Sequence, residues 1–141
     1  MPIAIDDVCL NKAAIIERCL NRVFQEYQSD PELLNWTHID ALVLNLERAC
    51  QAAIDLAMHL VSRERLGLPQ SSVQAFELLQ RTGLIQPQTA LSLTSMVGFR
   101  NIAAHEYRSL DLRIVKSIVQ KDWKTFVTFT RELGLKIEPK V

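Results

Sequence analysis

The sequence predicts an all-α fold, an antiparallel helical bundle of about five helices formed by residues 1–141 as a single domain. Apolar residues recur at steps of three and four along several long segments, which is the period of a helix face. No alternating apolar run is bounded by hairpin turn residues, so strands are not expected. The 141 residues are 48% hydrophobic, with only four Gly and five Pro. A chain of this size and composition can bury one core.

The first expected helix covers residues 5–27, and Asp30 and Pro31 end it. The second begins at Thr37, because Asp40 three residues later completes a variant capping box. It continues to about Leu66 and carries a stripe of apolar and small residues that lets a neighbouring helix approach closely. Gly67 and Pro69 are expected to stop it.

Three local signals predict the next two helices. Ser71 and Gln74 form a second capping box, and the short helix that they open ends at Gly83. Pro87 suits the first position of a fourth helix, which runs toward His105. Beyond it, Ser109 or Asp111 can cap one or two further helices over residues 114–133.

Composition excludes several classes of protein. No apolar run exceeds four residues, and two Asp occupy the N-terminus, so neither a transmembrane helix nor a signal peptide is expected. We therefore expect a soluble, cytoplasmic protein. Its three cysteines, Cys9, Cys19 and Cys50, form no C-x-x-C pair and are interpreted as buried apolar residues rather than disulfide or metal ligands.

The formal net charge is zero, which argues against broad nonspecific binding of nucleic acid. Its distribution is uneven: residues 1–98 carry 7 basic and 11 acidic side chains, and residues 99–141 carry 9 and 5. An anion site is therefore expected in the last third. Whether the late basic residues form a solvated face or an RNA track stays open; they are Arg108, Arg113, Lys116, Lys121 and Lys124.

Histidines are the first candidates for proton transfer near neutral pH. Asp55 and His59, four residues apart, are interpreted as a helix-surface pair, since two residues do not make a metal site. His105 lies in the string RNIAAHEY, where Arg100 precedes it by five positions and Tyr107 follows by two. The bare spacing is weak evidence, because an Arg and a His so placed arise often by chance.

The wider context resembles the HepT-like toxin family, a branch of the HEPN superfamily. The densest part is MVGFRNIAAHEY, residues 96–107, which fits the family signature of arginine, four to six residues, histidine, any residue and tyrosine. Three upstream blocks are similar to family sequence in the same order: AAIDLAMHLV (residues 52–61), GLPQSS (67–72) and AFELLQRTGLI (75–85).

The resemblance implies a metal-independent endoribonuclease without cofactor, the toxin of a bacterial toxin-antitoxin pair. Arg100 and His105 would be the catalytic pair, Asn101 would support the active site, and Tyr107 would support it and be adenylylated by a MntA-like nucleotidyltransferase antitoxin. The family is typically a homodimer whose two motifs face one cleft. A larger hetero-oligomer with the antitoxin stays open.

The residue chemistry is compatible with this activity. RNA supplies its own nucleophile, the 2′-hydroxyl, so an imidazole and a guanidinium can provide proton transfer and charge stabilisation. On one straight helix Arg100, Ala103, Ala104 and Tyr107 share a face, whereas His105 is turned from Arg100 by about 140°. Either the helix loosens near His105, or the site is composite between two subunits.

Two other functions remain compatible with the sequence. One is a non-catalytic helical partner that binds substrate for a nucleotidyltransferase. The other is a helical interaction protein with a vestigial motif, in which Arg100 bridges helices, His105 is a core histidine and Tyr107 packs a helix end. The intact motif favours an enzyme over the vestigial alternative.

Overall fold

The computed structural model describes residues 3–141, and the all-α prediction is confirmed over that range, where no strand occurs. Six α-helices form instead of about five. They are α1 (Asp7–Ser29), α2 (Trp36–Arg63), α3 (Ser72–Arg81), α4 (Pro87–His105), α5 (Leu112–Ser117) and α6 (Lys124–Glu132). A 3₁₀ turn, η1 (Tyr107–Ser109), follows α4, and a π-helical segment, η2 (Ile118–Asp122), joins α5 to α6.

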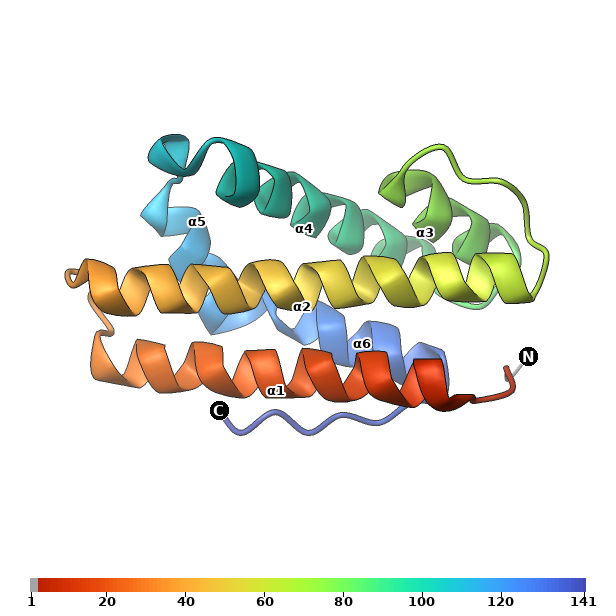
Figure 1. Ribbon diagram of the computed structural model, residues 1–141, viewed down its shortest axis with the longest axis horizontal. Helices are drawn as coiled ribbons and strands as arrows, with labels where there is room; N and C mark the ends of the chain where they lie inside the picture. The colour runs from red at the N-terminus through yellow and green to blue at the C-terminus, as the bar shows by residue number, and fades with distance from the viewer. Residues whose placement is uncertain (1–2) are drawn as a thin grey trace.

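The central element is α2. It runs antiparallel to α1 and also packs against α3 and α4 (Figure 1). The last residues of the chain form no helix and lie along α1, where the Glu138 backbone N–H donates to Glu17 Oε2 at 2.6 Å and that of Lys140 to Asn21 Oδ1 at 2.7 Å. Helices α3 and α4 contact α2 directly, and α6 is connected to it through α4.

Apolar side chains fill the space between these helices. Phe76 of α3 and Phe129 of α6 meet edge to face with ring centroids 5.9 Å apart, and both are fully buried. Burying a side chain of this size contributes about 2 kcal/mol. All three cysteines are buried thiols, as the sequence predicts.

The helix-start signals after residue 70 are confirmed. The Ser71 hydroxyl accepts from the Gln74 backbone N–H at 3.2 Å, and Pro87 occupies the first turn of α4. Gly83 follows α3 with φ near 81°, a left-handed conformation that glycine adopts without strain. Of the two caps proposed for the next helix, Asp111 is the one used, since its side chain accepts from the Arg113 N–H at 2.9 Å.

The predicted capping residue of α2 is wrong, and the helix ends three residues before the predicted end at about Leu66. Asn35, not Thr37, is the N-cap, and its side chain accepts from the Thr37 backbone N–H at 2.9 Å. Asp40 is not a capping residue, because its carboxylate instead accepts a hydrogen bond from the Tyr107 hydroxyl. The helix ends at Arg63, before Gly67, since Arg65 adopts a left-handed conformation with φ near 55°.

No helix between residues 3 and 141 is both long and apolar enough to cross a membrane.

Candidate functional site

The motif that the sequence singles out lies at the end of α4. His105 is the last residue of that helix, and the Glu106 backbone leaves the helical conformation with φ −136° and ψ 49°. Tyr107 then begins η1. α4 therefore stays helical from Arg100 to His105, and the loosening that was one of the two alternatives occurs only after His105. The prediction that Tyr107 shares a helix face with Arg100 is wrong, because no helix continues to Tyr107.

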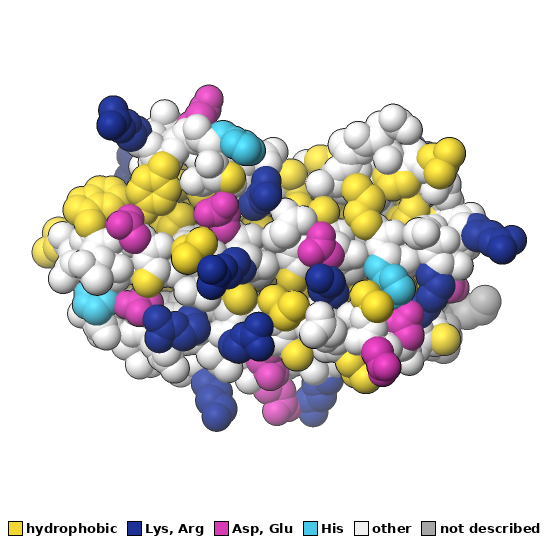
Figure 2. Space-filling view, in the orientation of Figure 1, with side chains coloured by type: hydrophobic (Ala, Val, Ile, Leu, Met, Phe, Trp, Pro, Cys, Tyr) yellow, Lys and Arg dark blue, Asp and Glu magenta, His cyan; other side chains and the backbone are white. Residues whose placement is uncertain are grey.

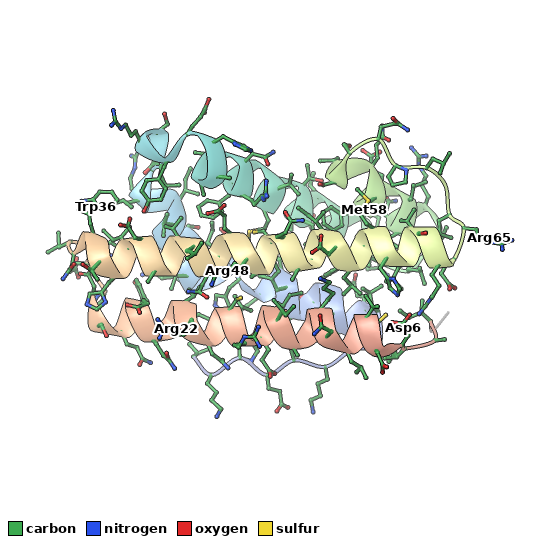
Figure 3. The ribbon with its side chains drawn as sticks, viewed as in Figure 1. Asp6, Arg22, Trp36, Arg48, Met58 and Arg65 are labelled. Carbon is green, nitrogen blue, oxygen red and sulfur yellow. The ribbon has the colours of Figure 1, made fainter. Side chains whose placement is uncertain are left out.

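Tyr107 connects this turn to the start of α2. Its hydroxyl donates a hydrogen bond to the Asp40 carboxylate, 67 residues earlier in the chain. Its ring also lies against Trp36, with centroids 6.2 Å apart and the planes tilted by 56°. Trp36 projects from the first turn of α2 and is 53% exposed (Figure 3). The α4–η1 turn is thus held on α2 by one polar and one aromatic contact.

Arg100 has an unusual hydrogen-bonding state. Its Nε is buried and has no partner, and its Nη1 makes only a long 3.4 Å bond to Asn101 Oδ1. Among residues 3–141 no carboxylate forms an ion pair with it, whereas Arg63, which also has a buried nitrogen without a partner, is paired with Asp6 and Glu64. Because no carboxylate neutralises it, the Arg100 guanidinium can bind an anion through its terminal nitrogens.

The charge of Arg100 lies close to Cys50 of α2, without making that cysteine reactive. Burial raises the pKa of the Cys50 thiol to about 12, although the Arg100 charge opposes the shift. Its Sγ donates to the Met96 carbonyl at 3.7 Å. A thiol that stays protonated at neutral pH is a poor nucleophile, so Cys50 serves packing.

His105 differs from the other two histidines. His38 Nδ1 lies 2.6 Å from Glu26 Oε2, and His59 Nε2 lies 2.7 Å from Asp6 Oδ2. His105 is exposed, and within the described part of the chain its ring has no hydrogen-bond partner. Histidine, acidic, basic and hydrophobic side chains are exposed together over the end of α4 and the adjoining part of α2 (Figure 2). The His105 ring nitrogens are therefore available to a bound molecule.

Tyr107 is held in its neutral form. Burial, the hydrogen bond to Asp40 and the negative charges of Asp40 and Glu47 raise the pKa of its hydroxyl far above the ordinary value. Burial is the largest of these causes. At neutral pH the Tyr107 oxygen can become a nucleophile only if another group accepts its proton.

The predicted Asp55–His59 surface pair does not form. Asp55 binds Lys12 Nζ at 3.3 Å, and His59 turns to Asp6. Asp6, Cys9 and His59 place one potential metal ligand each within 4.8 Å of one another. Asp6 is already the N-cap of α1, accepting from the Cys9 backbone N–H, and it also binds Arg63 Nη1 at 2.9 Å. These contacts lower the pKa of the Asp6 carboxyl. The residues therefore form a structural cluster that joins α1 to α2.

The late basic residues are not a uniform track. Arg113 is paired with Asp111 at 2.9 Å, and Lys116 lies 3.9 Å from Glu32. The other three, Arg108, Lys121 and Lys124, are exposed. A role in RNA binding stays a prediction for those three.

Sequence patterns did not identify the residues that α2 contributes. Trp36 and Asp40 contact Tyr107, and Glu47 is close enough for its charge to act on Tyr107. Trp36 and Asp40 are about one turn of α2 apart, and Asp40 and Glu47 are about two turns apart. A helix-face projection of residues 36–47 therefore places Asp40 and Glu47 on one side. Nothing local indicates which distant segment covers that side.

Comparison with known proteins gives the family. The family model for HepT-like ribonucleases matches residues 10–133. The mRNA nuclease HepT of Shewanella oneidensis is 41% identical over 125 residues, covering 88% of this chain and 94% of that protein. The tRNA nuclease HepT of Aphanizomenon flos-aquae is 26% identical over 89 residues, which is 63% of this chain and 60% of the relative.

The fold agrees with these sequence matches. A solved structure of the tri-AMPylated Shewanella oneidensis HEPN toxin in complex with its MNT antitoxin is similar with a TM-score of 0.88 and 39% identity. The similarity covers 92% of this chain and 98% of the toxin. The protein therefore belongs to the HepT-like family of ribonucleases.

Proposed function

We propose that this protein is the toxin of a bacterial toxin-antitoxin pair and cleaves RNA in the cytoplasm at a site formed by Arg100 and His105. The observation that carries the proposal is that neither side chain is paired with a carboxylate among the described residues. The Arg100 guanidinium has no ion-pair partner among residues 3–141, and His105 is the described histidine that forms no hydrogen bond or ion pair with a carboxylate. Five positions apart in the chain, they offer an anion-binding group and a proton-transfer group.

Each residue has a defined role in this reaction. The 2′-oxygen of the substrate attacks the neighbouring phosphorus, and the 5′-oxygen of the next nucleotide leaves. Arg100 binds the phosphate oxygens and stabilises the charge that develops on them. His105 transfers a proton, either from the 2′-hydroxyl or to the leaving oxygen. Asn101, which accepts from Arg100 Nη1 at 3.4 Å, supports the orientation of the guanidinium.

This route needs neither a metal ion nor a cofactor, because the nucleophile belongs to the substrate. Its products are a 2′,3′-cyclic phosphate and a 5′-hydroxyl. RNA is the substrate class that the relatives share, since one is named an mRNA nuclease and the other a tRNA nuclease. Because those two names differ, the proposal stops at RNA as a class.

We further propose that a MntA-like nucleotidyltransferase is the antitoxin and that Tyr107 is the residue it modifies. The tri-AMPylated state and the MNT complex of the Shewanella oneidensis toxin support this partner. Tyr107 lies two residues after His105, so an attached adenylate would bring negative charge and bulk to the RNA-binding end of α4. The modified toxin would then bind RNA poorly.

A homodimer completes the proposal. Arg100 is half-buried and its charge acts on Cys50 of α2, whereas His105 is exposed at the helix end. Two-fold pairing of this region would place two copies of the motif around one cleft. We propose that each catalytic site draws on both subunits.

Expression in bacteria tests the proposed function. The wild-type chain alone should arrest growth, and His105→Ala should relieve the arrest. His38→Ala is the matched control and should arrest growth like wild type, because His38 pairs with Glu26 of α1 and has no contact with Arg100 or His105 among the described hydrogen bonds and ion pairs. Growth arrest that survives His105→Ala would contradict the assignment of the site.

A further inference from the structure

The hydrogen bond between Tyr107 and Asp40 carries an inference that rests on the proposed modification of Tyr107. The donor is the hydroxyl of the residue to be modified, and the acceptor is a carboxylate of the same chain. Asp40 is exposed on α2, and this is its only side-chain hydrogen bond to a described residue. Within the described residues, the Asp40 side chain therefore accepts a hydrogen bond from Tyr107 alone.

Adenylylation of a phenol requires the loss of its proton. The surroundings of Tyr107 keep it protonated, since burial and the nearby carboxylates raise its pKa. A protonated phenol is a weak nucleophile toward phosphorus, and a base within hydrogen-bond reach removes that obstacle. Among the described residues, Asp40 is the group that holds this proton.

We propose that Asp40 is the base that accepts the Tyr107 proton when the antitoxin transfers the first adenylate. In this step the Tyr107 oxygen forms a bond to the α-phosphorus of ATP. The bond between the α-phosphorus and the bridging oxygen breaks, and pyrophosphate leaves with the electron pair. The phenolic proton passes to the Asp40 carboxylate and from there to water. The toxin thus supplies both the nucleophile and its base.

Geometry restricts this role to the first transfer. Once Tyr107 carries an adenylate, its oxygen is a phosphodiester oxygen and has no proton. Any later adenylate would attach to a hydroxyl of the first nucleotide, beyond the carboxylate of Asp40. Loss of Asp40 should therefore slow the first mass increment and not the following ones.

Glu47 provides a matched control on the same helix. Its negative charge acts on Tyr107, but no hydrogen bond joins the two side chains. Asp40→Asn and Glu47→Gln each remove one negative charge near the phenol. Only Asp40→Asn removes the proton acceptor, so the pair separates base catalysis from electrostatics.

The experiment follows the mass of the chain during incubation with its nucleotidyltransferase partner, ATP and Mg²⁺. Asp40→Asn should lower kcat for the first adenylate about a hundredfold and leave the KM for the chain within about threefold. Asp40→Glu should restore at least a tenth of the wild-type rate, and Glu47→Gln should stay within about threefold of wild type. Thermal unfolding of each variant verifies that it folds.

The outcomes separate this inference from the function on which it rests. A wild-type chain modified on Tyr107 and an Asp40→Asn chain modified equally fast would overturn the role of Asp40 and leave the proposed function intact. A raised KM with unchanged kcat would also overturn it, because that pattern indicates docking. If the wild-type chain gains no mass at Tyr107, the proposed modification fails, and the role of Asp40 fails with it.

Discussion

His105 and Tyr107 lie on two different elements, although one residue separates them: His105 closes α4, and Tyr107 opens the 3₁₀ turn that follows. The break at Glu106 frees the tyrosine to meet Asp40 on α2 while the histidine stays exposed. Under the proposed function, the short spacing of the motif would place RNA cleavage and its control at one helix end.

The guanidinium geometry of Arg100 should matter more than its charge. Arg100→Lys keeps one positive charge but loses the planar pair of donors, so we expect the cleavage rate to fall about a hundredfold. Initial rates on a labelled RNA measure this. Arg81→Lys, an exposed substitution on α3, is the control and should leave the rate unchanged. Equal losses in the two variants would refute a specific role of Arg100.

Mixed subunits should reveal a shared site. If each site takes Arg100 from one subunit and His105 from the other, a mixture of Arg100→Ala and His105→Ala chains should regain cleavage in its heterodimers. Activity of the mixture compared with each variant alone is the measurement. A fully active monomer, shown by light scattering at the assay concentration, would rule out the composite site.

Alkaline pH should destabilise the protein through Tyr107. The pKa of Tyr107 is raised in the folded state, so its contribution to stability is complete below the unfolded value of about 10 and declines as pH rises above it. Tyr107→Phe lacks this proton, and its Tm should fall less steeply from pH 9 to pH 11. If Tm fell equally with pH in both proteins, the pKa of the Tyr107 phenol would be the same in the folded and unfolded states, which would contradict the prediction.

Substitutions of Asn35 and Thr37 test which residue caps the N-terminus of α2. Asn35→Ala should lower the free energy of unfolding by about 1 kcal/mol, because the Thr37 N–H loses its acceptor. Thr37→Ala should change it by less than about 0.5 kcal/mol, since the exposed Thr37 side chain caps nothing. Urea denaturation measures both. A larger loss for Thr37→Ala would support the cap expected from the sequence pattern.

The starts of α2, α3 and α4 show which sequence patterns predict helix boundaries correctly. Ser71 and Pro87 act through neighbouring residues, so their patterns locate the starts of α3 and α4 correctly. Thr37 is not the cap because the helix already begins at Trp36, and the Asn35 side chain accepts from the Thr37 backbone N–H. Patterns over a few residues also contain no information on which distant element a side chain meets.

The same limit applies to the candidate site. The motif and its resemblance identify Arg100, His105 and Tyr107, and the helix end at His105 agrees with the predicted extent of α4. Asp40 lies 67 residues from Tyr107, and its contact depends on how α4 crosses α2. That crossing is set by the packing of whole helices, so only the structure reveals it.

Cleavage of RNA in the presence of a chelator tests the central claim most directly. The purified protein in EDTA should cut RNA and leave a 2′,3′-cyclic phosphate and a 5′-hydroxyl, a DNA strand should survive, and His105→Ala should lose at least about a hundredfold in rate. Activity that disappears in EDTA and returns with Mg²⁺, or a His105→Ala protein as active as wild type, would contradict a metal-independent site built on Arg100 and His105.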